Sequence, residues 1–176
     1  MPARLADLVE PPLVSLLFAL LVLLFLVPAA HAGIADSPAP NLTGASRNTT
    51  KVIYSVTGVY NNAGLGTYFS CTNVSTSTIT LGVEVFGPVG GGPVNNALTT
   101  AATLGAGATV LYGTSTPVGI TPDANLGLGT IVTGSARSVA TSKALVCDAF
   151  VAERLNAPPT TMLHLTIVAK TKQKGE

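Results

Sequence analysis

Apolar and polar residues alternate most regularly over residues 77–86. Ile79, Leu81, Val83 and Val85 are separated there by threonine, glycine and glutamate. A period of two is typical of a β-strand that turns one face to the protein core and the other to solvent. The pattern therefore predicts a half-buried strand with these four aliphatic side chains in the core.

Shorter apolar or β-branched runs recur along the rest of the chain. They predict strands at residues 52–56, 66–73, 98–104, 108–112, 128–133, 136–140, 143–152 and 161–170. Stretches rich in Gly, Pro and Asn separate these runs, and no segment after residue 33 has the 3.6-residue period of a helix. The sequence thus predicts an all-β domain, an immunoglobulin-like β-sandwich of about 7–9 antiparallel strands.

The N-terminal 32 residues have the features of a secretory signal peptide. An uncharged apolar run at residues 13–27 is followed by Ala30-His31-Ala32, whose small residues suit a signal peptidase. We expect a signal-peptide helix within residues 1–32 and cleavage between Ala32 and Gly33. The alternative is an uncleaved membrane anchor, but a spanning helix needs about 20 apolar residues, more than this run provides.

The chain after the cleavage site divides into two parts by composition. Residues 33–50 are rich in Pro, Ala, Asn, Ser and Thr, and only Ile34 and Leu42 are larger apolar residues. Such a segment buries little apolar surface, so we expect a flexible leader. Residues 51–176 contain every predicted strand and are expected to form a single domain.

Two cysteines, Cys71 and Cys147, follow the expected cleavage site. In an oxidising compartment a disulfide is the simplest expectation, and a redox-active pair would normally show a C-x-x-C spacing. Each cysteine lies in a predicted strand, which indicates a buried bridge between strands. A bridge that joins two facing sheets would favour a sandwich over a small barrel, and closing a loop of this length stabilises the fold by about 4–5 kcal/mol.

Composition and charge exclude several classes of protein. The chain is 47% hydrophobic and 10% charged, with a net charge of +1. A disordered chain would show high charge and few apolar residues. A nucleic-acid-binding domain would need a strongly basic surface. We therefore expect a folded domain that binds no nucleic acid and whose mature form does not span a membrane.

Several stretches carry a resemblance to known proteins. Phe69-Ser70-Cys71-Thr72-Asn73, residues 79–86 and residues 104–110 resemble immunoglobulin-like sandwich domains of bacterial surface proteins. Residues 135–147, with 157–159 and 165–170, are similar to a set of uncharacterised exported bacterial proteins. The resemblance implies a small exported β-domain and brings no known activity or catalytic residue. The chain departs from true immunoglobulin domains because it has no Trp and no Tyr two residues before Cys147.

Candidate catalytic and metal-ligating residues are few. His164 is the only histidine after the cleavage site, so a Ser-His-Asp site would need it, and a solvent-facing strand histidine is the simpler expectation. A blue-copper site built from Cys147, Met162 and His164 would lack its second histidine. Asp123 lies in a turn with too few oxygens for calcium. The sequence therefore predicts no catalytic residue, no metal and no cofactor.

Two further patterns have simple explanations. Alternating lysines at the C-terminus attract an acidic surface weakly, but solubility explains them equally well; they are Lys170, Lys172 and Lys174. Three Asn-x-Ser/Thr triplets match the N-glycosylation pattern, which arises by chance in a chain rich in Ser and Thr; they begin at Asn41, Asn48 and Asn73.

These observations favour a secreted or periplasmic domain that binds or scaffolds an unknown protein or cell-surface ligand and is not an enzyme. The loops at residues 60–66, 87–96 and 113–126 are its expected contact surfaces. The alternative is a self-assembling structural subunit of a cell-surface layer or fibre, in which the leader pairs with a neighbour's exposed sheet edge.

Overall fold

The computed structural model describes residue 34, residues 37–44 and residues 49–170. The expected signal peptide with its Ala32–Gly33 cleavage site lies outside these residues, as do Lys172 and Lys174. Within the described part no helix occurs that is long and apolar enough to cross a membrane.

Every regular element of the described chain is a strand, which confirms the all-β expectation. The ten strands are β1 (Lys51–Asn62), β2 (Leu65–Asn73), β3 (Ile79–Phe86), β4 (Ala102–Leu104), β5 (Thr109–Gly113), β6 (Ala124–Asn125), β7 (Ile131–Ala140), β8 (Leu145–Glu153), β9 (Met162–His164) and β10 (Ile167–Ala169).

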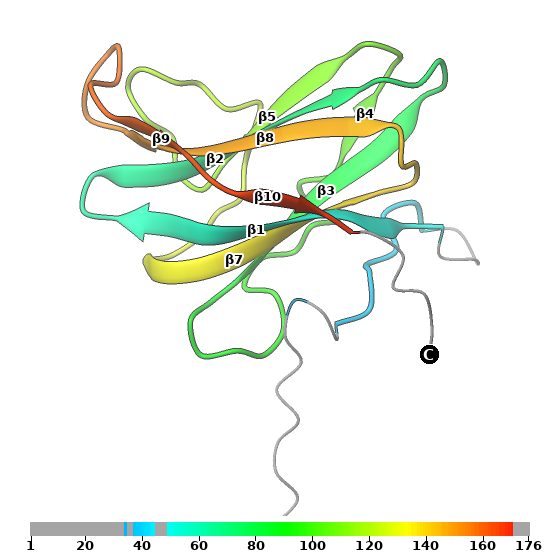
Figure 1. The fold of residues 1–176 in the computed structure, drawn as a ribbon, viewed down its shortest axis with the longest axis horizontal. Helices are drawn as coiled ribbons and strands as arrows, with labels where there is room; N and C mark the ends of the chain where they lie inside the picture. Colours follow the sequence, from blue (N-terminus) through cyan, green and yellow to red (C-terminus); the bar gives the residue numbers. More distant parts are fainter. Residues whose placement is uncertain (1–33, 35–36, 45–48, 171–176) are drawn as a thin grey trace, which may run out of the picture. The chain divides into compact units, whose positions relative to one another are not determined.

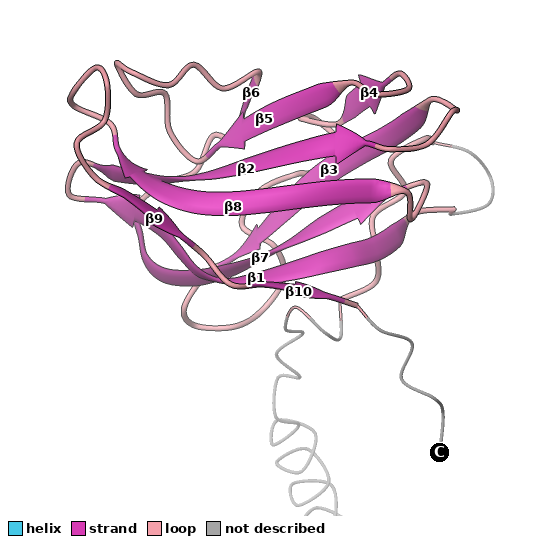
Figure 2. Ribbon diagram, turned by 45° about the horizontal axis from the view of Figure 1, so that its top comes forward, coloured by secondary structure: helices cyan, strands magenta, loops and turns pink. Residues whose placement is uncertain are grey.

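The strands form one strongly curled mixed sheet, a half-barrel (Figures 1 and 2). The order β4-β3-β7-β1-β2-β5-β6 runs round the curl, and β8 lies off this path, where it pairs with β2. The pairs are antiparallel except for β5 with β6, which is parallel. The last strands link the two sides, because β9 pairs with β8 and β10 pairs with β1. The expectation of a clear immunoglobulin sandwich is therefore corrected to a half-barrel.

The geometry of β1 explains the curl. Its pairing with β7 slips at three places along the strand, and such bulges bend a strand and increase its twist. At its end β1 turns directly into β2 through Ala63 and Gly64, which both have positive φ (47° and 81°). A two-residue turn of this kind keeps two strands in one sheet. The chain thus bends a continuous sheet instead of dividing into two separate ones.

The core lies inside the curl and contains the side chains that the alternation predicts. Ile79, Leu81, Val83 and Val85 of β3 are all buried. Their neighbours include aliphatic and aromatic residues from β1, β2, β5 and β7. Leu165, between β9 and β10, and Ile167, the first residue of β10, pack against the same core.

The outer face of β3 and β7 is also covered, which the alternation does not predict. Gly82 and Phe86 are buried on this face along with Glu84. Leu42 of the expected leader and Ala97 of the 87–101 loop pack there against Val139. An added Cβ at Gly82 would lie 3.0 Å from the Ala97 carbonyl oxygen and 3.2 Å from a Leu42 methyl carbon. Strand β3 is therefore buried on both faces, not half-buried.

Some expected strand limits differ from the structure. The expected strands 128–133 and 136–140 are one strand, β7, and only residues 102–104 of the stretch 98–104 are extended. The expected strand 161–170 is divided into β9 and β10 because its two halves pair with different strands. The long loop expected at 113–125 ends in the short strand β6.

Candidate functional site

Cys71 and Cys147 form a disulfide, as the sequence predicts. They lie opposite each other on the neighbouring strands β2 and β8, with their Cα atoms 4.1 Å apart. Cys71 is buried and Cys147 is half-buried. The bridge therefore links adjacent strands of one sheet, and the expectation that it joins two facing sheets is wrong. A disulfide is consistent with an oxidising, extracytoplasmic location.

His164 lies on the exposed surface of β9, as expected for a solvent-facing strand histidine. Its Nδ1 atom is 3.3 Å from Oδ2 of Asp148, and both side chains are more than half exposed. Ser70 of β2 lies in register with Asp148 of β8. Asp148 therefore lies between Ser70 on β2 and His164 on β9. General-base activation of serine needs the histidine in the middle position. This group therefore lacks the order of a Ser-His-Asp site.

The other candidate ligands also have structural partners. The Asp123 carboxylate accepts a hydrogen bond from the Leu111 N–H at 2.7 Å and so ties the 114–123 loop to β5. The Cys147 sulfur is bonded to Cys71, so it is not a thiolate that could bind copper. Within the described residues no three His, Cys, Asp or Glu side chains are grouped to hold a metal ion.

A buried ion pair stands under the N-terminal segment. The Arg137 Nε atom donates to Glu84 Oε2 at 2.7 Å, and the guanidinium lies 5.2 Å from the centre of the Phe86 ring. Its remaining nitrogens donate to the carbonyl oxygens of Ile34 (2.9 Å), Ser37 (2.7 Å) and Pro38 (2.9 Å). Each of the three guanidinium nitrogens thus has a hydrogen-bond partner inside the protein, which is how a buried charge is tolerated. The guanidinium holds Ile34, Ser37 and Pro38 on the sheet.

Asn73 organises the loops at one end of the half-barrel. Its side chain is completely buried, and its Nδ2 atom donates to the carbonyl oxygens of Ser77, Leu104 and Gly105 at 2.8–3.1 Å. Its Oδ1 atom accepts from the N–H and the hydroxyl of Ser75. The sequence reading assigned Asn73 only to a glycosylation triplet. The serine two positions later suits an Asx turn, and this is the sequence signal from which the structural role of Asn73 could have been predicted.

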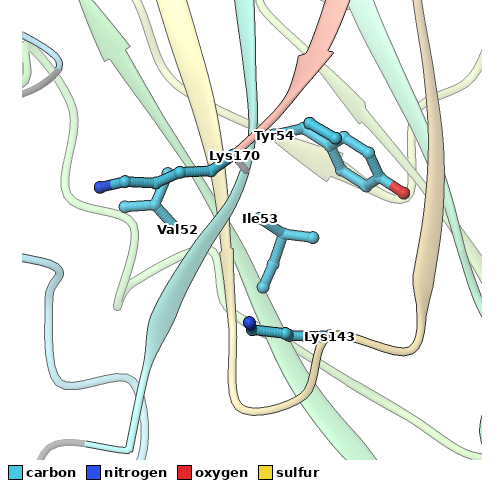
Figure 3. A pocket seen from close by; sticks show the side chains of 6 residues that line it. Val52, Ile53, Tyr54, Lys143 and Lys170 are labelled. Atoms are coloured by element: carbon cyan, nitrogen blue, oxygen red, sulfur yellow. The ribbon is translucent and has the colours of Figure 1, made fainter. Parts of the chain in front are cut away.

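The same end carries a shallow pocket of about 170 Å³ (Figure 3). Residues 74–78, 105–108 and 141–144 and Lys170 form this end, which we call the lysine end. Hydrogen bonds join its parts, from the Val74 N–H to the Ala144 carbonyl (3.1 Å) and from the Lys170 N–H to the Ile53 carbonyl (2.9 Å). The pocket is lined by Val52, Ile53, Tyr54, Lys143, Ala169 and Lys170.

The charges of the lysine end are unbalanced in the described part of the chain. Lys51, Lys143 and Lys170 are exposed there. Ion pairs among the described residues join only Glu84 to Arg137 and Asp148 to His164. The remaining described carboxylates belong to Asp123, which bonds to β5, and Glu153, whose pKa is lowered by hydrogen bonds from Thr160 and Asn156. The lysine end therefore attracts anions.

Comparisons with protein-family models, curated proteins and solved structures found no match to this chain. The resemblance to exported immunoglobulin-like proteins is thus supported only at the coarse level of an all-β protein of ten strands. Sequence reasoning identified Lys170 as part of a basic tail, but it missed Lys143 and the pocket between them.

Proposed function

We propose that the protein is an exported, non-catalytic binding or scaffolding module that contacts its partner through the lysine end. The observation that carries this proposal is the support given to the loops of that end by the buried Asn73 side chain, with its five hydrogen bonds. The N-terminal signal features and the disulfide support export.

Loops that are ordered before binding lose less conformational entropy when a partner docks. At the lysine end Asn73 also orders the loop before β5 through its backbone. Its N–H donates to the Ala108 carbonyl, and its carbonyl accepts from the Gly107 N–H, at 2.9 Å each. The disulfide joins β2 to β8 two residues before Asn73. A rigid sheet that carries fixed loops is a common scaffold for recognition.

A pair of matched crosslinking variants tests this function. Val74 at the lysine end and Val132 at the opposite end have nearly equal exposure, 58% and 57%. A photoreactive amino acid is placed at either position in the full chain, which is then expressed in its native host and irradiated. We expect one discrete adduct from position 74 and none from position 132. Equal adducts from both positions, or none from either, would contradict the proposal.

Self-assembly is a second candidate function, favoured by the apolar surface of the last two strands. Met162, Leu163 and Val168 are 51%, 61% and 58% exposed, and each of β9 and β10 has one paired neighbour only. Exposed edges of this kind pair readily with another chain. The leader is a weaker candidate for this exchange, because Arg137 already binds the carbonyl oxygens of Ile34, Ser37 and Pro38 within the same chain. A crosslinker at Leu163 that yields a product of twice the chain mass would favour this function.

A further inference from the structure

We propose that the pocket of the lysine end binds a small organic carboxylate whose apolar group has about six to eight carbons. This inference rests on the proposed binding function and names a ligand class for one part of the same surface. Three features of the pocket carry it: its apolar floor, its two lysines and the hydrogen bonds that hold its walls.

The floor of the pocket is apolar. Val52, Ile53 and Ala169 line it, and Ile53 is almost completely buried in the core below. The volume of about 170 Å³ is close to that of a protein cavity that accepts benzene, roughly 150 Å³. A short alkyl or aryl group therefore matches the floor in size and polarity, whereas a longer chain would extend into solvent.

The rim of the pocket is cationic. Lys143 comes from the loop between β7 and β8, and Lys170 follows β10, so the two lysines line the pocket from different elements on either side of Ile53, with the Lys170 side chain extending outward past Val52 (Figure 3). None of the six described residues that line the pocket carries a carboxylate. Two lysines in the lining, beside an apolar floor, favour a ligand with one anionic head and one apolar stem. A neutral or cationic molecule of the same shape lacks the head-group contacts.

The walls of the pocket are held in place by hydrogen bonds within the described chain. The Tyr54 hydroxyl donates to the Leu145 carbonyl at 2.6 Å, which joins β1 to the start of β8. The Lys170 N–H donates to the Ile53 carbonyl at 2.9 Å, which joins the end of β10 to β1. The Tyr54 hydroxyl proton is used in this bridge. The two lysines are therefore the side chains that recognise the anionic head.

The test is a titration of the ¹⁵N-labelled, purified full chain as exported, followed by two-dimensional NMR. Octanoate is the probe. Octanol is the control without charge, octylamine the control with the opposite charge, and inorganic phosphate the control without an apolar stem. We expect octanoate to shift the amide signals of Val52, Ile53 and Ala169 with a dissociation constant on the order of 1 mM, as suits about ten non-hydrogen atoms. Octanol, octylamine and phosphate should each bind at least fivefold more weakly.

Matched variants separate the pocket from the general charge of this end. The double variant Lys143→Gln/Lys170→Gln should weaken octanoate binding about five- to tenfold, as expected for two partly exposed ion pairs. Lys51→Gln removes a charge at the same end but outside the pocket lining, and it should change the affinity less than twofold. Ala169→Leu should weaken octanoate by filling the floor and leave the charge unchanged.

Several results would overturn the inference. Octanol binding as tightly as octanoate would show that the lysines play no part, and phosphate binding equally well would reduce the site to a simple anion site. An unchanged affinity in the double lysine variant would also show that the lysines play no part, provided that the dispersed NMR spectrum of the variant shows it to be folded. If octanoate fails to bind while the Val74 crosslink forms, the binding function stands without this ligand. If octanoate binds and the crosslink fails, the pocket stands without the macromolecular partner.

Discussion

Buried polar side chains determine much of the local geometry, and Tyr112 shows how. Its ring is completely buried, and its hydroxyl donates to the Leu81 carbonyl at 2.8 Å across the interior of the curl. Burial raises the pKa of the phenol far above its usual value. The neutral form is therefore strongly favoured in the folded protein. A single hydroxyl thus ties β5 to β3 and makes the fold sensitive to alkaline pH.

Replacing Tyr112 with Phe should have opposite effects at neutral and at alkaline pH. At pH 7 the variant loses the hydrogen bond to the Leu81 carbonyl, which lowers the free energy of unfolding by about 0.5–1.5 kcal/mol. The stabilisation linked to the raised pKa is complete below the unfolded pKa of about 10 and is lost as pH rises toward the folded pKa. The variant should therefore lose less stability than the wild type between about pH 10 and 12.

Urea unfolding at a series of pH values measures both effects of Tyr112→Phe. Tyr60→Phe is the control, because Tyr60 is only half-buried, and it should keep the alkaline slope of the wild type. Parallel pH profiles for the Tyr112 variant and the wild type would show that this phenol does not control alkaline stability.

At the scale of elements, the turn between β1 and β2 decides how the sheet continues. Asn61 pairs with Gly66, and Asn62 pairs with Leu65, across the two-residue turn. Ala63 has φ 47°, a left-handed conformation that costs a residue with a Cβ some energy. The sequence pattern Asn-Asn-Ala-Gly indicated a loop here, and the structure shows that it is a tight hairpin. Its strain is local, because Ala63 is exposed.

The variant Ala63→Asn should stabilise the protein. It creates the Asn-Gly pair that two-residue hairpin turns prefer, and we expect a gain of about 0.5–1 kcal/mol in the free energy of unfolding. Ala106→Asn is a control in the exposed turn before β5, where only the neighbouring Gly107 has positive φ. Chemical unfolding compares the two variants. A loss of stability at position 63 would mean that the turn does not have this conformation in solution.

At the scale of the whole molecule, the N-terminal segment acts as a cover for the outer face of the sheet. Arg137 binds the carbonyl oxygens of Ile34, Ser37 and Pro38, and Leu42 is 5% exposed. The Asn95 side chain adds to this cover by bonding the Val83 carbonyl and the Val85 N–H at 2.8 Å each. The edge of β3 beyond β4 is thereby closed to other chains.

The variant Leu42→Ala should destabilise the fold if this cover belongs to it. Removing the side chain from its contacts with Ala97 and Val139 should lower the free energy of unfolding by about 2–3 kcal/mol. Leu98→Ala is the matched control, since Leu98 is 50% exposed, and it should cost less than about 0.5 kcal/mol. Equal, small effects would mean that residues 33–50 behave as the flexible leader that their composition predicts.

Sequence patterns were informative where the physics is local. The alternation in residues 79–86 placed four side chains in the core, and two cysteines in a β-rich chain with the features of an exported protein predicted their bond. Arg137 and Glu84 could not be predicted as a buried pair, because the two residues lie on different strands that are 53 positions apart in the sequence. The Ile34 carbonyl that Arg137 also binds is 103 positions away. Lys143 and Lys170 likewise line one pocket only because β10 returns to pair with β1.

The sequence by itself determined the strand content, the core face of β3 and the disulfide, because side-chain period and thiol chemistry act over short distances or through a single pair of residues. Only the tertiary structure decided that the strands curl into a half-barrel, that the outer face of β3 is covered and that two lysines share a pocket. These features depend on bulges, crossings and pairings between distant segments, whose energies no local pattern of residues records.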